Sequence, residues 1–454
     1  MNSEVDSLSQ DPRRWLTLII AATGLLLICV DITVLYIALP TLTRELGASD
    51  TSRLWIINAY PLVVAGLLPG LGTLGDRYGH RRLFVVGLAI FGMASLAAAY
   101  SPTTGLLIAA RALQGVGGAA MMPATLAIIR SSFSDPRERA WALGIWSGVA
   151  SGGMALGPVI AGALLEHFWW GSVFLINVPV VILALAAVPW VIPPGARTGG
   201  APWDLRGSLQ LLVGLTAVVF AIKEIAHEPF SMLRLCLALA VGTAFLVIYL
   251  RGQKTRAQPL IDLTLFRQHE FAAGFAAASC GTAGAVGVEL ALGQHLQLVM
   301  DRSPLEAALV LLPMPLGAFI AGPIAGGLLH RIRPKLLMAG GFALAAGCAV
   351  LLPVFPLSIV LLTGIGLGIG ATVTCASTTV MNAAPPQRAG MAASIEEVGF
   401  ELGGAVGIAV FGTLMTLVFR RAPADALDAV LVGAALLWCA TGAAVAILVR
   451  KKSG

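Results

Sequence analysis

Six ionisable side chains lie deep inside long apolar stretches of this 454-residue chain. Placing one such group at the centre of a membrane helix costs about 2.5–3.5 kcal/mol, so each is expected to be paired or to have a function. A carboxylate in such a place can take up and release a proton, and when ionised it can bind a cation. The pattern therefore predicts proton and cation binding. The six residues are Asp31, Arg111, Glu289, Glu396, Glu397 and Glu401.

Three of these carboxylates fall within six residues of each other. Glu397 and Glu401 share a helix face at a spacing of four residues, whereas Glu396 points to another side. Carboxylates crowded in a low-dielectric environment cannot all be ionised, so at least one is expected to carry a proton near neutral pH. We assign all three to binding of a cationic substrate, and Glu397 also to proton coupling. The alternative for Glu396 is that it faces the cytoplasmic mouth of the helix.

Glu289 lies near the middle of the apolar segment 271–299, where a lone carboxylate is a candidate contact for a cationic substrate. Aromatic rings attract quaternary ammonium groups through cation–π interactions. Trp146, Phe319 and Phe400 lie deep enough in their segments to take part, and the alternative for each is a position facing lipid. The substrate site is therefore expected to combine carboxylates with aromatic rings.

Asp31 and Arg111 lie in the first and fourth apolar segments, 15–40 and 104–130. At ~1.5 Å of rise per residue, both fall in the outer half of the membrane at similar depth. We expect them to form an ion pair with a functional role. The alternative is a buried pair with a purely structural role.

Fourteen apolar segments position these residues, each near or above the ~20 residues that a membrane-spanning helix needs. The whole chain is 57% hydrophobic and 11% charged, whereas soluble domains carry about 25% charged residues. A soluble globule is therefore excluded. The predicted fold is an all-α membrane protein with fourteen transmembrane helices.

The basic residues indicate how these helices are oriented. With the N-terminus inside, 21 of the 29 Lys and Arg residues fall on inner segments and 7 on outer ones, while Arg111 lies within a helix. Because basic loops stay in the cytoplasm, this bias predicts both termini on the cytoplasmic side of a bacterial-type inner membrane. The polar start and the long apolar run after it indicate no cleavable signal peptide. The basic residues behind the net charge of +6 lie mainly on these inner segments, so this charge does not indicate a nucleic-acid-binding protein.

The connector between the second and third segments is small, acidic once and rich in arginine. We expect a short cytoplasmic loop in which Gly72 and Gly75 let two helix ends approach and Asp76 pairs with an arginine of a neighbouring element. The alternative is an ordinary cluster of topology-setting arginines. The residues of the connector that we assign to conformational change are Gly72, Gly75, Asp76, Arg77, Gly79 and Arg81, within Gly72-Thr-Leu-Gly-Asp-Arg-Tyr-Gly-His-Arg-Arg82.

A weaker copy of this connector, at residues 326–335, follows eight helices later. It implies two six-helix bundles, residues 1–192 and 271–454, with two inserted helices and their cytoplasmic linkers at 193–270. Two such halves, related by an axis along the membrane normal, place a transport site between them.

The fifth segment carries glycines at spacings of four residues and then Gly157-Pro158-Val-Ile-Ala-Gly162. Glycines on one face let a neighbouring helix backbone pack closely. Pro158 removes a backbone donor and can kink the helix. We assign Gly157 and Pro158 to conformational change, and tight packing alone is the alternative.

These motifs resemble those of the major facilitator superfamily, in particular its fourteen-helix drug:proton antiporters, along nearly the whole chain. The segments 29–40, 72–82, 107–120 and 157–162 are similar to the family's motifs, with Ala161 replacing one glycine of the antiporter motif. The resemblance implies that Arg111 takes part in proton coupling, and we assign the same role to its predicted partner Asp31. The pair Glu396-Glu397 resembles the subgroup that exports quaternary ammonium compounds and methyl viologen.

The sequence thus predicts a secondary active transporter rather than an enzyme: a proton-coupled antiporter that exports lipophilic cations such as biocides, dyes and viologens. Its expected partners are these small molecules, protons and the lipid bilayer, and we expect a monomer. No cofactor is expected, because there is no P-loop lysine motif for ATP. The six cysteines lack C-x-x-C spacing and indicate neither disulfides nor a metal site. The alternatives are a metabolite or siderophore exporter on the same fold and a non-transporting membrane sensor.

Overall fold

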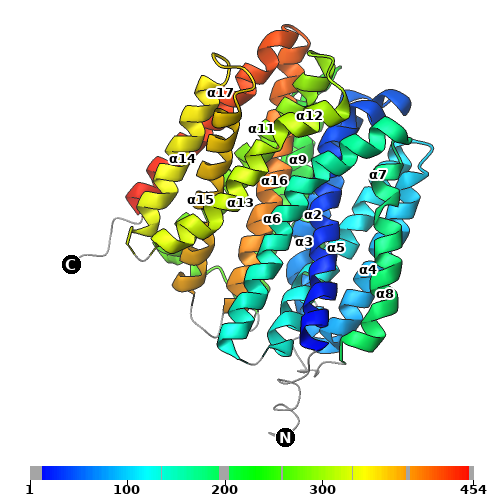
Figure 1. Ribbon diagram of the computed structural model, residues 1–454. Coiled ribbons are helices and arrows are strands. Elements are labelled where there is room, and N and C mark those ends of the chain that lie inside the picture. Colours follow the sequence, from blue (N-terminus) through cyan, green and yellow to red (C-terminus); the bar gives the residue numbers. More distant parts are fainter. Residues whose placement is uncertain are drawn as a thin grey trace, which may run out of the picture.

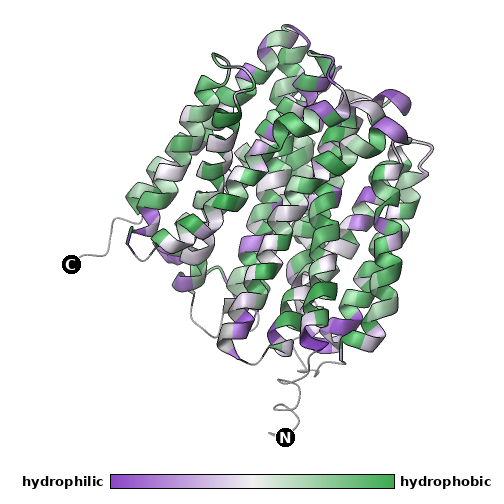
Figure 2. Cartoon of the chain, in the orientation of Figure 1, coloured by the Kyte–Doolittle hydropathy of each residue, from purple (hydrophilic) through white to green (hydrophobic). Residues whose placement is uncertain are grey.

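The computed structural model describes residues 13–133, 135–193, 204–256, 259–329, 331–384 and 389–448. In these ranges all regular elements are helices, and fourteen spans are long and apolar enough to cross a membrane. Figures 1 and 2 show them running side by side, with most hydrophilic residues toward the two ends of the bundle. The predicted fold class and number of spans are confirmed, and the chain is a multi-pass membrane protein.

The N-terminal bundle consists of six spans. Its sixth span is divided at Ile176, whereas each of the others is one helix. The helices are α2 (Arg13–Glu45), α3 (Asp50–Tyr78), α4 (His80–Ala99), α5 (Thr104–Ser132), α6 (Pro136–His167), α7 (Ser172–Leu175) and α8 (Asn177–Val191). α5 packs against α3 and α4, and α2 packs against α6 and α5.

The C-terminal bundle also has six spans, the second of which is divided at Leu312 before Pro313. The proline lacks a backbone N–H and therefore begins a new helix more easily than it continues the old one. The helices are α11 (His269–Leu298), α12 (Pro304–Leu311), α13 (Pro313–Leu328), α14 (Pro334–Leu351), α15 (Ile359–Ala383), α16 (Ala389–Phe419) and α17 (Ala426–Leu448), with short 3₁₀ turns η1 (Leu265–Arg267) and η3 (Pro423–Asp425).

Two further helices, α9 (Leu205–Glu224) and α10 (Met232–Thr255), pack against each other between the bundles in sequence. α9 also contacts α3 of the N-terminal bundle and α16 of the C-terminal bundle. The division of the chain after residues 192 and 270 remains a prediction from the sequence.

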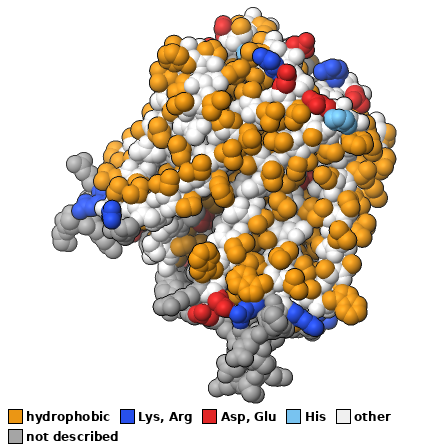
Figure 3. All heavy atoms as spheres, viewed as in Figure 1, with side chains coloured by type: hydrophobic (Ala, Val, Ile, Leu, Met, Phe, Trp, Pro, Cys, Tyr) orange, Lys and Arg blue, Asp and Glu red, His pale blue; other side chains and the backbone are white. Residues whose placement is uncertain are grey.

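The visible surface is largely apolar. Figure 3 shows hydrophobic side chains over most of this face and charged ones mainly near its two ends. Large side chains such as Leu183 and Trp190 are 71% and 81% exposed. Apolar exposure on this scale would be a liability in water, and it is the surface that lipid covers in a membrane.

The connector at 72–82 differs from the predicted loop, because nearly all of it is helical. α3 extends to Tyr78 and α4 begins at His80, so the link is Gly79 alone, with φ +99°. Such a φ suits glycine and strains other residues. A Cβ at Gly75 would lie 2.5 Å from the His80 ring, so a close approach is required there. At Gly72 a Cβ would lie 3.8 Å from Pro123, which is an ordinary contact, and the close approach predicted for Gly72 is wrong.

The polar groups of this connector have local partners. The carboxylate of Asp76 lies 3.0 Å from Nε2 of His80, one turn further along the chain. The Arg77 guanidinium lies 5.4 Å from the centre of the Tyr78 ring. Arg81 reaches the carbonyl of Pro189 on α8 at 3.5 Å, and so links the connector to the sixth span.

Candidate functional site

Asp31 and Arg111 form the predicted ion pair deep in the N-terminal bundle. Asp31 lies on α2 and Arg111 on α5, and Nη1 of the arginine donates to Oδ2 of the aspartate. Asp31 is 0% exposed and Arg111 is 1% exposed. Two charges sealed from water in this way need further hydrogen bonds to offset their lost hydration.

Two uncharged side chains supply those hydrogen bonds, and a third, Ser95, accepts from both of them. Gln114 on α5 and Asn177 at the start of α8 donate from their amide nitrogens to Oδ1 of Asp31, at 3.0 and 2.9 Å. Oε1 of Gln114 accepts from Arg111 at 2.8 Å, and its Nε2 also donates to Oγ of Ser95 on α4 at 2.9 Å. We call these five residues the Asp31 cluster.

The uncharged members of the Asp31 cluster were missed by the sequence analysis. Isolated Gln, Asn and Ser residues carry no charge that would mark them in an apolar segment. One available indication was the position of Gln114, three residues after Arg111 and therefore on the same helix face.

Aromatic rings flank the arginine. Its guanidinium carbon lies 5.0 Å from the centre of the Tyr60 ring and 5.7 Å from that of Phe174, and Nε lies 3.4 Å from the carbonyl oxygen of Ile56. Tyr60 packs so closely on α5 that a Cβ at Gly118 would lie 2.3 Å from its hydroxyl oxygen. The guanidinium is therefore held between a carboxylate and two rings, which adds cation–π attraction to the ion pair.

Glu396 turns away from the other glutamates of α16. It is 4% exposed, and its carboxylate accepts a hydrogen bond from Oγ of Ser377 on α15, in the same bundle. Glu397 and Glu401 lie on a different face of the helix, as their spacing predicts. A contact between Glu396 and substrate remains a prediction, and its engagement with α15 weighs against a large contribution.

Glu289 of α11 and the two remaining glutamates of α16 face α2 of the other bundle. Glu289 and Glu401 both interact electrostatically with the hydroxyl of Tyr36 on α2. Glu397 and Glu401 interact in the same way with Cys29, two turns earlier on that helix. In the ranges that the structure describes, these three glutamates have no hydrogen bond or ion pair. We call Glu289, Glu397 and Glu401 the interface carboxylates.

Tyr60 lies between the two acidic sites. Its hydroxyl interacts electrostatically with Glu401 on one side and with Asp31 and Arg111 on the other. Tyr60 is 0% exposed, and no hydrogen-bond partner for its hydroxyl occurs among the described residues. Tyr60 is therefore within electrostatic range of both the Asp31 cluster and Glu401.

The aromatic residues assigned to the substrate site lie in different surroundings. Trp146 is partly buried against a core made mainly by the N-terminal bundle, and Phe400 against a core to which both bundles contribute. Phe319 is 46% exposed, on the same exposed face of α13 as Ile320 and Ile324. Their assignment to substrate binding continues to rest on the sequence.

The glycines of α6 divide into two groups. A Cβ at Gly157 would lie 1.9 Å from Oγ1 of Thr33, and one at Gly153 would lie 3.0 Å from Cβ of Cys29, so these two permit close packing on α2. Gly148 and Gly152 have no neighbouring atom within 4 Å of such a Cβ. The predicted close packing is therefore correct for Gly153 and Gly157, which share a helix face, and wrong for Gly148 and Gly152. The helix continues through Pro158.

The two bundles close on each other at the upper end in Figure 1, opposite the start of α2. A Cβ at Gly162 of α6 would lie 2.5 Å from Cα of Leu305 on α12. Beside it, Oγ of Ser303 donates to the carboxylate of Glu166 at 3.0 Å. On the other side, a Cβ at Gly412 of α16 would meet Leu54 of α3 at 2.6 Å. The bundles are closed at the end that the Lys and Arg pattern places outside.

Replacing Gly162 by leucine is expected to favour opening at this end, because the larger side chain cannot fit against the α12 backbone. Spin labels at His167→Cys and Arg302→Cys, in a background without the native cysteines, should report a longer distance than in the protein that keeps Gly162. Gly105→Leu is the matched control, because a Cβ there meets no atom within 4 Å. An unchanged distance distribution in Gly162→Leu would show that this contact does not control closure.

Known proteins are similar to this chain over most of its length. A family model described as Major Facilitator Superfamily matches residues 21–408. The methyl viologen resistance protein SmvA of Salmonella typhimurium is 39% identical over 413 residues, which cover 90% of this chain and 83% of that protein. The multidrug efflux pump LfrA of Mycolicibacterium smegmatis is 37% identical over 414 residues, covering 90% and 82%. The puromycin resistance protein pur8 of Streptomyces alboniger is 38% identical over 417 residues, covering 89% and 82%.

Proposed function

Because the chain belongs to the Major Facilitator Superfamily and is therefore a transporter, we propose that it exports lipophilic cations in exchange for protons. Candidate substrates are quaternary ammonium biocides, cationic dyes and viologens. Two relatives named for methyl viologen resistance and multidrug efflux support this class of substrate. Methyl viologen itself is a permanent organic cation.

The observation that carries the proposal is the contrast between the two acidic sites. Asp31 is neutralised by Arg111 and has its hydrogen bonds satisfied. The interface carboxylates have no such partner among the described residues. An ionised carboxylate away from water is costly unless a counter-ion joins it. A lipophilic cation is such a counter-ion, and its apolar body suits the helices around it.

The proposed cycle uses the two sites in turn. With the outer end closed, a cation entering from the cytoplasm binds the interface carboxylates. When the outer end opens, protons from outside take the place of the cation, and Asp31 exchanges its bond to Arg111 for a proton. Inward movement of each proton charge supplies about 2.3 kcal/mol per 100 mV of membrane potential, in addition to any pH gradient. No cofactor enters this cycle.

The proposed setting is the inner membrane of a bacterial-type cell, with both termini in the cytoplasm and the chain acting as a monomer. The bias of 21 inner against 7 outer basic residues supports this orientation. An even number of spans, fourteen, also places the start of α2 and the end of α17 on the same side.

The proposal is tested by expression in a host whose own efflux pumps are deleted. Tolerance to benzalkonium, ethidium and methyl viologen should rise several-fold, and the gain should disappear when a protonophore collapses the proton gradient in an ethidium efflux assay. An anionic or neutral toxic compound of similar size serves as the control and should show no change. Tolerance only to anionic compounds would favour the metabolite or siderophore exporter instead.

A further inference from the structure

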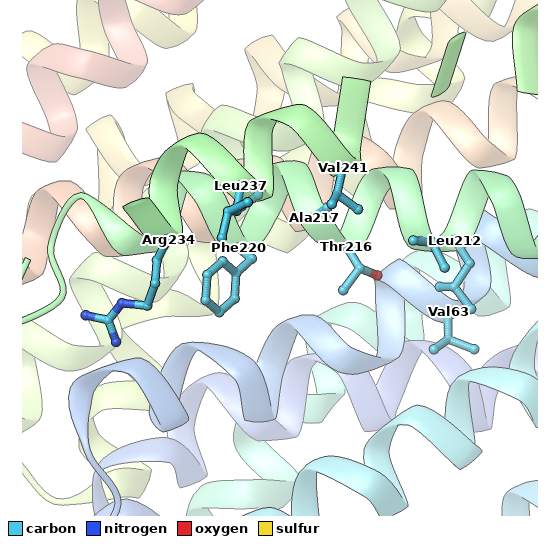
Figure 4. Close-up of a pocket in the computed structure, with 10 residues that line it drawn as sticks. Val63, Leu212, Thr216, Ala217, Phe220, Arg234, Leu237 and Val241 are labelled. Atoms are coloured by element: carbon cyan, nitrogen blue, oxygen red, sulfur yellow. The ribbon is translucent and has the colours of Figure 1, made fainter. Parts of the chain in front are cut away.

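A groove separates the inserted helices from the N-terminal bundle at a distance from both acidic sites. Figure 4 shows it between α9, α10 and α3. It has a volume of about 640 Å³, and apart from Thr216 and Arg234 its lining is apolar. The residues that define it are Val63, Leu212, Thr216, Phe220, Arg234 and Leu237.

The groove is a gap between two tight contacts of α9 with α3. At one end a Cβ on Gly66 would lie 2.7 Å from Cβ of Leu212. At the other end the ring centres of Trp55 and Phe220 are 6.3 Å apart. Leu212 and Phe220 are eight residues apart, which corresponds to ~12 Å of helix, so the space between them is long and narrow. It suits an extended hydrocarbon chain.

The groove is open to the hydrocarbon of the membrane. Both α9 and α10 are long and apolar enough to span a membrane. Only 17% of the most apolar stretch of α10 is buried inside the protein. Leu237 and Val241 on its wall are 55% and 41% exposed. Water has too few polar partners here to fill the space, whereas lipid chains reach it from the side.

The mouth of the groove near the α9–α10 turn carries one exposed arginine, Arg234. Nε of Arg234 forms an ion pair with Oε1 of Glu224 at 3.0 Å, and Nη2 donates a hydrogen bond to the carbonyl oxygen of Pro229 at 2.6 Å. The side chain of Arg234 is still 41% exposed. The Lys223 side chain nearby is 3% exposed and has no hydrogen-bond partner among the described residues, so we do not count it as a charge at the mouth. Its Nζ lies 4.0 Å from the centre of the Trp55 ring, which stacks on Phe220. The exposed guanidinium of Arg234, which is paired with Glu224, is thus the group that this end of the groove offers to a ligand.

We propose that the groove binds an acyl chain of an anionic glycerophospholipid whose phosphate contacts Arg234. The exposed guanidinium of Arg234 can donate hydrogen bonds to a phosphate, whereas a lipophilic cation offers it no acceptor. The bound chain fills the gap between α9 and α3 and so joins the inserted pair to the N-terminal bundle.

Native mass spectrometry of the purified full chain, with dioleoyl phosphatidylglycerol or dioleoyl phosphatidylcholine added, tests this assignment. The wild type should retain one phosphatidylglycerol in preference to phosphatidylcholine. Arg234→Gln should retain it about five-fold less, since one basic residue near a membrane surface contributes about 1 kcal/mol. Arg302→Gln is the matched control, because Arg302 is also an exposed, ion-paired arginine, on a different part of the chain. It should behave as the wild type.

A groove-filling variant tests the chain site separately from the charge. Ala217→Trp should lose both lipids while eluting as a single folded species, and Leu237→Trp replaces it if that variant does not fold. Equal retention of phosphatidylglycerol by wild type and Arg234→Gln would overturn the headgroup contact. Unchanged retention in the groove-filling variant would overturn the site. Displacement of the lipid by ethidium would assign the groove to substrate entry instead.

Discussion

Asp31→Asn is expected to abolish cation export driven by a proton gradient. The substitution removes the charge that balances Arg111 and places an amide where Gln114 and Asn177 already donate. The oxygen of the new amide could still accept one hydrogen bond, but the group cannot exchange a proton at neutral pH. Ethidium accumulation in everted vesicles energised by an inward proton gradient should fall to the background level.

Two comparisons separate a coupling role from a structural one. Glu224→Gln alters another buried carboxylate that pairs with an arginine, on the inserted helix α9, and should leave export nearly unchanged. Asp31→Asn itself should still exchange labelled for unlabelled ethidium across the membrane without any proton gradient. A mutant that continues to concentrate ethidium would show that the proton site lies elsewhere. If Asp31→Asn does not accumulate in the membrane, Asn177→Ala keeps the ion pair and should lower export about ten-fold through one lost hydrogen bond to a charged group.

The parts of this structure that charge and hydrophobicity specify were predictable from the sequence. Apolar length marks the spans, because a bilayer imposes a minimum length on every crossing helix. The depth of Asp31 and Arg111 in their segments was enough to pair them, because burial of either charge alone is costly. The separation of Glu396 from Glu397 followed from helical periodicity.

Other features depend on packing between helices that are distant in sequence. Asn177 reaches Asp31 from the sixth span, a contact across 146 residues that no local pattern indicates. The helical connector at Gly79 was mistaken for a loop because arginines and glycines also suit loops. On α6, Gly157 meets α2, whereas Gly148, nine residues earlier and therefore on the opposite helix face, meets no neighbour.

The second large effect is expected at the interface carboxylates. Glu289→Gln, Glu397→Gln and Glu401→Gln should each weaken binding of ethidium or benzalkonium by about 30-fold or more. Removing one member of a buried charge pair costs about 2–5 kcal/mol, and the bound cation is the other member. Glu396→Gln is the matched control, because its carboxylate is engaged by Ser377 on α15. It should bind nearly as the wild type does.

The same sites predict a dependence of binding on pH. A cation binds the ionised carboxylate, and a proton converts that carboxylate to a neutral acid, so the two ligands compete. The affinity of the purified protein for ethidium should therefore be lower at pH 5.5 than at pH 8. This difference should shrink in Glu289→Gln, Glu397→Gln and Glu401→Gln and persist in Glu396→Gln. Equal affinities at both pH values, unaffected by the three substitutions, would show that the interface carboxylates do not bind the exported cation.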